Sequence, residues 1–193
     1  MRDLNNFRPI NEIEKSIINT SLQKFSVEIL SYIKQEKYRI YILDNDENKN
    51  TSFPLIFLVS YKNSIILEEN LKSERVSSAG IYFGFIKKGE FYLSLEGAEF
   101  FFKNNRIQDR NILRLNNKGE KAVLYGNPVV KSMVAGISSD LKKNIVMLVV
   151  NELREVLALA RSEIDFSKYK LLKQGDLVAI NLTDKGYYLR RKQ

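Results

Sequence analysis

The residue types best suited to covalent chemistry are missing from this chain. It has no histidine and no cysteine, which excludes thiol nucleophiles, histidine acid–base catalysis and Cys/His zinc sites. It also lacks a glycine-rich phosphate loop after a strand and a serine in a G-x-S-x-G turn. The paired carboxylates Glu68 and Glu69 lie in a charged run, which is typical of a solvated surface. We therefore expect no enzyme, no metal site and no cofactor.

Basic side chains are the groups that could bind a ligand. Distributed cations suit a phosphate backbone, because each contact releases counterions, and a tyrosine among them could stack on a base. The alternative is that such lysines are ordinary surface residues and the tyrosine belongs to the core. The candidate RNA-binding residues are Lys131, Arg161, Lys168, Tyr169, Lys170 and Lys173.

The positive charge is concentrated in the second half of the chain. The formal net charge is +8 and the pI is about 9.5. Residues 111–193 hold 15 basic and 8 acidic side chains, a net of +7, whereas residues 1–110 hold 16 and 15, a net of +1. This asymmetry favours an acidic partner for the second half, and nucleic acid is the usual one.

The composition predicts two domains, at 1–108 and 111–191, with a polar linker between them. In the first domain, a capping box of Asn11 and Glu14 predicts a helix over 12–25, with Ile13 on its buried side. We expect strands at 38–42, 53–61 and 64–67, a hairpin of 79–85 with 90–95, and a short helix at 98–102.

The polar segment 44–51 has acidic residues at calcium-loop spacing. However, Lys49 stands where such a loop needs glycine, and Leu55 stands where it needs a bidentate glutamate. The segment is therefore expected to be a solvated turn.

The stretch 124–137, LYGNPVVKSMVAGI, is the part around which we expect the second domain to be organised. Gly126 should end a strand at 123–125, and Pro128 should begin a helix with one apolar face. The other predicted elements are a strand at 111–115, a turn at 116–119, strands at 145–150 and 156–160, a helix at 167–172, and a terminal hairpin of 177–182 with 187–190. The predicted fold class is α+β, an N-terminal α/β domain followed by a small β-barrel.

This order of elements, with the run Gly175-Asp176-Leu177-Val178, resembles a PUA domain, a small RNA-binding barrel. Over nearly the whole chain, the sequence is also similar to the NIP-seven family of ribosome-biogenesis factors. That similarity is carried by Arg8-Pro9, Lys131-Ser132 and the segments 76–80, 83–85, 91–93 and 124–127. Eukaryotic members often have histidine where this chain has Pro128, so the resemblance indicates an archaeal type of member.

The resemblance implies a non-enzymatic assembly factor of the large ribosomal subunit. Its PUA domain would bind precursor ribosomal RNA, and its N-terminal domain would contact other assembly proteins. The alternative function is an RNA-targeting module that guides a separate modification enzyme. The apolar runs are too short to span a membrane, and the N-terminus has no apolar signal core. We therefore expect a monomeric intracellular protein, cytoplasmic, or nucleolar if the source is a eukaryote.

Overall fold

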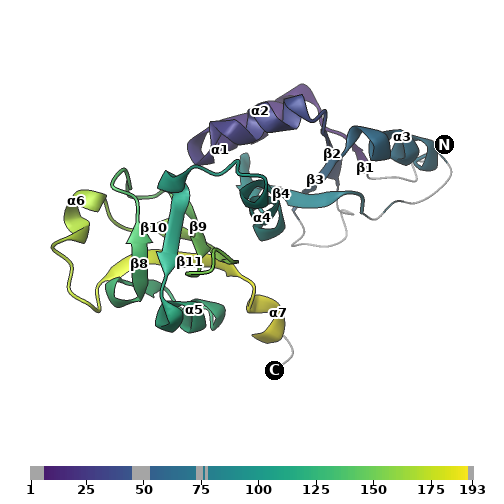
Figure 1. The fold of residues 1–193 in the computed structure, drawn as a ribbon. Helices are drawn as coiled ribbons and strands as arrows, with labels where there is room; N and C mark the ends of the chain where they lie inside the picture. The colour runs from purple at the N-terminus through teal and green to yellow at the C-terminus, as the bar shows by residue number, and fades with distance from the viewer. Residues whose placement is uncertain (1–6, 45–52, 73–75, 77, 191–193) are drawn as a thin grey trace. The chain divides into compact units, whose positions relative to one another are not determined.

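The computed structural model describes residues 7–44, 53–72, 76 and 78–190. The chain divides into two compact units, Met1–Arg106 and Ile107–Gln193, and each contains one sheet (Figure 1). An α/β unit is thus followed by a nearly closed β-barrel, which confirms the predicted fold class. None of the described helices combines the length and the apolarity that crossing a bilayer requires.

The first unit is built on a five-stranded antiparallel sheet whose strands lie in chain order. α1 packs against β5, and α4 packs against β4. The strands are β1 (Phe7–Pro9), β2 (Arg39–Leu43), β3 (Leu55–Val59), β4 (Ile81–Lys87) and β5 (Glu90–Leu93). The helices are α1 (Glu12–Phe25), α2 (Val27–Gln35), α3 (Tyr61–Asn70) and α4 (Leu95–Lys103).

Helix α1 confirms the predicted capping box and boundaries, but one predicted inward residue is wrong. Oδ1 of Asn11 accepts from the Glu14 amide at 2.9 Å, and the Glu14 carboxylate accepts from the Asn11 amide at 2.8 Å. Ile13 is 74% exposed, because the buried stripe of α1 runs through Ile18 and Leu22. Ile13 lies off that stripe.

Two further predictions for the first unit have different outcomes. The hairpin of β4 with β5 and the helix α4 are confirmed. The predicted strand at 64–67 is wrong, because Ser60 accepts a hydrogen bond from the Asn63 amide at 3.4 Å and so caps the helix α3. A short apolar run is compatible with a strand or with a helix, and here the Ser60 cap stabilises the helix. Most of the candidate calcium loop, at 45–52, lies outside the described residues.

The second unit is a six-stranded sheet that closes almost completely into a barrel. Irregularities in the pairing of β10 with both neighbours and of β6 with β8 help the strands to bend. Leu113, Met147, Leu157 and Val178 are among the buried interior residues. The spatial order is β7 (Val129–Val130), β11 (Leu177–Asp184), β10 (Val156–Ser162), β9 (Val146–Val150), β6 (Ile112–Leu115) and β8 (Val134–Ile137).

The elements predicted between 116 and 137 are wrong. The helix of this region lies earlier, as α5 (Asn117–Leu124), because Asn116 is its N-cap and accepts from the Gly119 amide at 3.0 Å. Gly126, with a φ of +86°, follows the end of α5 instead of ending a strand. The β-branched residues beyond it then form β7 and β8, joined by the 3-10 turn η2 (Lys131–Met133).

The predicted C-terminal hairpin is also wrong. Residues 187–190 form the short helix α7 (Tyr187–Arg190), and β11 pairs with β10 and β7. The guanidinium of Arg190 donates to the carbonyl of Leu124 and, at 2.9 Å each, to both carboxylate oxygens of the buried Asp184. This contact with the end of α5 outweighs the strand propensity of the tyrosines.

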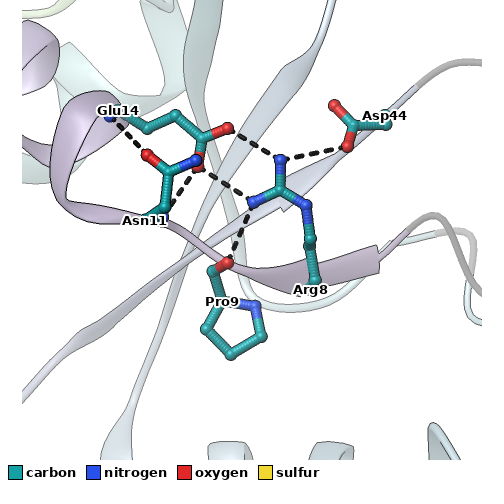
Figure 2. A network of polar contacts seen from close by, with 5 residues as sticks. All are labelled: Arg8, Pro9, Asn11, Glu14 and Asp44. Carbon is teal, nitrogen blue, oxygen red and sulfur yellow. Dashed lines mark hydrogen bonds and ion pairs between the residues drawn. The ribbon is translucent and has the colours of Figure 1, made fainter.

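One polar network joins β1, the start of α1 and the end of β2 in the first unit (Figure 2). The guanidinium of Arg8 donates to both carboxylate oxygens of Glu14, at 2.7 and 3.0 Å, and lies 3.2 Å from Asp44 Oδ2. The hydrogen bonds from Arg8 lower the pKa of Glu14, and the Asn11 amide adds to the effect. The network therefore favours the ionised carboxylate in the folded protein.

Replacing Glu14 by glutamine should lower the free energy of unfolding at neutral pH by about 1 kcal/mol, since a charge-assisted pair near the surface is lost. Because the folded pKa is depressed, this contribution is complete above the unfolded pKa of about 4.3. It should disappear as pH falls through the folded pKa. Urea unfolding from neutral to acidic pH measures this difference.

The matched control is Glu12→Gln, which removes the same charge from the same helix turn at an exposed position. It should change the free energy of unfolding by less than about 0.5 kcal/mol at any pH. A Glu14→Gln effect that is independent of pH would contradict the assigned role of the carboxylate.

Candidate nucleic-acid interface

The predicted site residues other than Arg161 gather around one turn of the barrel. This turn spans 166–176 and begins with α6 (Phe166–Tyr169), which is shorter than the helix predicted at 167–172. The Lys131 amide donates to the Asp176 carbonyl at 3.0 Å, and the Ser132 amide donates to the Gln174 carbonyl at 2.9 Å. We call this turn, together with Lys131 and Ser132, the η2–α6 surface.

Lys131 lies within this surface, and its ammonium is used by the fold. Nζ donates to the carbonyl of Leu172 at 2.6 Å and to that of Lys170 at 3.3 Å. It also lies 5.5 Å from the ring centroid of Tyr169. The helix predicted to begin at Pro128 would have contained Lys131, but the residue lies in η2 instead. Lys131 instead holds the chain that follows α6, where carbonyls lack helical partners.

Lys168, Lys170 and Lys173 are exposed, and none of their ammonium groups forms an ion pair with any other described residue. The helix ends at Tyr169, so Lys170 and Lys173 lie beyond it and do not share a helix face. The nearby carboxylate of Asp176 accepts from the backbone amide of Lys173 at 2.7 Å. Three cations are thus presented by one turn whose backbone is held in place.

Tyr169 lies on the inner side of this turn. Its ring stacks on Phe166, with centroids 6.2 Å apart and planes 13° apart, and both rings pack against the barrel core. Burial raises the pKa of Tyr169. This geometry matches the alternative interpretation of Tyr169 as a packing residue. The apolar side chain that the turn exposes is Leu171, at 84%.

Leu171 was not among the residues predicted from sequence. It stands next to Leu172 in the run Lys170-Leu171-Leu172-Lys173, and one leucine packs inward while the other points to solvent. Two adjacent leucines after a short helix carry no periodic signal that would distinguish them.

Arg161 is placed differently from the lysines of the turn. It lies on β10 and donates to Glu163 Oε1 at 3.1 Å, while the ammonium of Lys143 lies 4.0 Å from the other carboxylate oxygen. Two cations therefore share one carboxylate, which leaves a local excess of positive charge. A phosphate would have to compete with Glu163 for Arg161, so its contribution to binding should be smaller.

Within the described residues, no three acidic side chains come together in a group that could hold a metal ion. The η2–α6 surface presents three exposed ammonium groups and one exposed leucine. Such a surface can attract and hold an anionic chain.

Replacing Lys131 by methionine should destabilise the barrel by about 1–2 kcal/mol, because two carbonyls lose a charged donor while the aliphatic stem is kept. Amide hydrogen exchange in the turn 166–176 should also become faster, since its anchor is lost. Urea unfolding and exchange measured by mass spectrometry test both effects.

The control is Lys170→Met, which removes an exposed ammonium from the same turn and should change the stability by less than about 0.5 kcal/mol. Equal stability and equal exchange for the two variants would show that Lys131 does not anchor the turn.

Comparisons with known proteins agree with this architecture. Residues 111–193 match the family described as the UPF0113 PUA domain. A UPF0113 protein of Archaeoglobus fulgidus is 30% identical over 115 residues, which cover 60% of this chain and 63% of that protein. The matched part of the chain thus spans less than two thirds of the length of this relative.

Solved structures show the same fold at low sequence identity. A hypothetical protein of Pyrococcus horikoshii OT3 has a TM-score of 0.63 at 13% identity, over 92% of this chain and 93% of that one. A PUA domain from Aeropyrum pernix K1, solved with tartrate, has a TM-score of 0.62 at 14% identity, over 96% and 90%. The predicted PUA resemblance is confirmed: residues 111–193 match a PUA-domain family, and their described part, 111–190, is a nearly closed barrel preceded by an α/β region.

Proposed function

We propose that this protein is a non-enzymatic RNA-binding factor that assists assembly of the large ribosomal subunit. In this proposal the PUA domain contacts precursor ribosomal RNA, and the N-terminal unit contacts other assembly proteins. The protein acts as a monomer in the cytoplasm, or in the nucleolus of a eukaryotic cell.

The single observation that carries the RNA-binding part is the η2–α6 surface. Lys168, Lys170 and Lys173 lie on one turn of a PUA domain, and no described carboxylate neutralises them. The backbone of the turn is hydrogen-bonded to η2 and held by Lys131. The turn should therefore lose little further conformational entropy when it binds RNA. The excess of positive charge in residues 111–193, 15 basic against 8 acidic side chains, supports the same assignment.

The assignment to ribosome assembly rests on the resemblance to the NIP-seven family. The residues that carry this resemblance include Arg8-Pro9, which contribute to the network of Figure 2. They also include the segment 124–127, which connects α5 to β7. The absence of histidine and cysteine from the chain supports a role without catalysis.

The RNA contact is tested by replacing Lys168, Lys170 and Lys173 with glutamate. Affinity for all RNA sequences should fall to a similar extent, because phosphate contacts carry no base information. The slope of log K against log salt should shrink in magnitude by about 2, at about 0.7 per lost contact with single-stranded RNA. Fluorescence anisotropy titrations at several salt concentrations give both quantities.

A matched control has the same change of charge in the N-terminal unit: Lys24, Lys62 and Lys72 are exposed and are replaced with glutamate. We expect this variant to keep most of the affinity and of the salt slope. If the Lys168, Lys170 and Lys173 variant is folded and binds RNA as the parent does, then the η2–α6 surface is not the RNA contact.

Isolation of the protein from its own cells separates the assembly role from the alternative, a module that guides a modification enzyme. An assembly factor should co-sediment with particles that contain large-subunit precursor RNA, and RNase treatment should release it. Recovery with an RNA-modifying enzyme, and without such particles, would favour the alternative function.

A further inference from the structure

Three aromatic rings form a row in the first unit. The centroids of Phe85 and Tyr92 are 5.2 Å apart and their planes differ by 8°, while Phe53 and Phe85 are 5.7 Å apart with planes at 27°. We call Phe53, Phe85 and Tyr92 the aromatic row. Phe53 is 38% exposed and Tyr92 is 41% exposed, so the row is in contact with solvent at both ends.

Strand pairing places this row on one face of the sheet. Phe85 of β4 is directly opposite Tyr92 of β5 and also opposite Leu55 of β3, and residues paired in this way point to the same side. The neighbouring residue of β5, Phe91, is buried and contacts Phe83 on the other face, where α1 and α4 pack. The unit therefore has a filled core behind β4 and β5, and on the opposite face the row ends in the exposed ring of Tyr92.

The position of Tyr92 leaves room for another planar group. Its strand, β5, is the last strand of the sheet, so no described strand continues the row beyond it. Its hydroxyl donates to Glu90 Oε2 at 3.2 Å, which orients the ring. Stacked rings that end at a sheet edge can be extended by a further ring, and nucleobases stack on such side chains in a sequence-tolerant way.

Two cations accompany the row. The ammonium of Lys87 lies 4.6 Å from the ring centroid of Phe53, and Lys88 is exposed in the turn between β4 and β5. Neither ammonium forms an ion pair with any other described residue. In this hairpin the carboxylate of Glu90 is engaged by the Tyr92 hydroxyl. Rings beside cations fit a nucleic-acid strand better than an apolar protein surface.

We propose that the aromatic row stacks a base of single-stranded RNA, while Lys87 and Lys88 contact the adjacent phosphates. This is a second RNA contact, in the first unit, and it goes beyond the function proposed for the PUA domain. It contributes mainly stacking, whereas the η2–α6 surface contributes mainly charge.

The test uses the full chain and a single-stranded RNA of uridines that contains one 2-aminopurine. Tyr92→Leu should weaken binding by about 5- to 100-fold, the range expected for the loss of one stacked base. The salt slope should stay unchanged, because no cation is removed. The protein-induced change in 2-aminopurine fluorescence should decrease.

Tyr92→Phe is the matched control, because it keeps the ring and removes the hydroxyl. It should bind within about twofold of the parent, and thermal unfolding followed by circular dichroism should show that both variants are folded. The glutamate variant of Lys168, Lys170 and Lys173 should lose salt slope and keep the fluorescence change at saturation. The experiment can therefore contradict either proposed RNA contact without contradicting the other.

Equal RNA affinity and equal fluorescence change for folded Tyr92→Leu and the parent would overturn the proposal. If that variant instead lost binding to an assembly protein, the aromatic row would be a protein contact and the proposal would be wrong.

Discussion

The PUA domain depends on one short segment that pairs with both edges of its sheet. β7 pairs with β11 at one edge, β8 pairs with β6 at the other, and η2 joins them in the chain. Because a closed sheet has almost no free edge, this segment protects backbone groups that would otherwise be open to pairing with other chains. The Asn116 side chain, which caps α5, also donates to the Ser132 carbonyl at 2.9 Å and so ties the closure to α5.

The candidate RNA surface depends on this closure. The amides of Lys131 and Ser132 in η2 bond to the turn 166–176, and the Lys131 ammonium bonds to two more of its carbonyls. The exposed lysines are therefore attached to a fixed backbone instead of a loose loop. A preorganised cation cluster loses less entropy when it binds an anionic chain, which is why the closing segment and the candidate RNA surface are best understood together.

Local signals predicted much of the fold. The capping box of α1 and the hairpin turn before Glu90 are encoded by neighbouring residues, and they were identified. The segment 129–137 was misassigned because its apolar spacing also fits a helix, and its true partners are distant in sequence. The role of Lys131 depends on carbonyls 39 and 41 residues away, and Arg190 depends on a carbonyl 66 residues away. The charge asymmetry pointed to this half of the chain, whereas the site geometry required the tertiary structure.

The central claim is that RNA lies against the turn 166–176 of the PUA domain. Ultraviolet crosslinking of the full-length protein to RNA, followed by mass spectrometry of the crosslinked peptides, tests it most directly. We predict crosslinked peptides from the turn 166–176, with or without a second set that contains Tyr92. Crosslinks confined to peptides outside the turn 166–176 would contradict the claim and place RNA binding elsewhere in the protein.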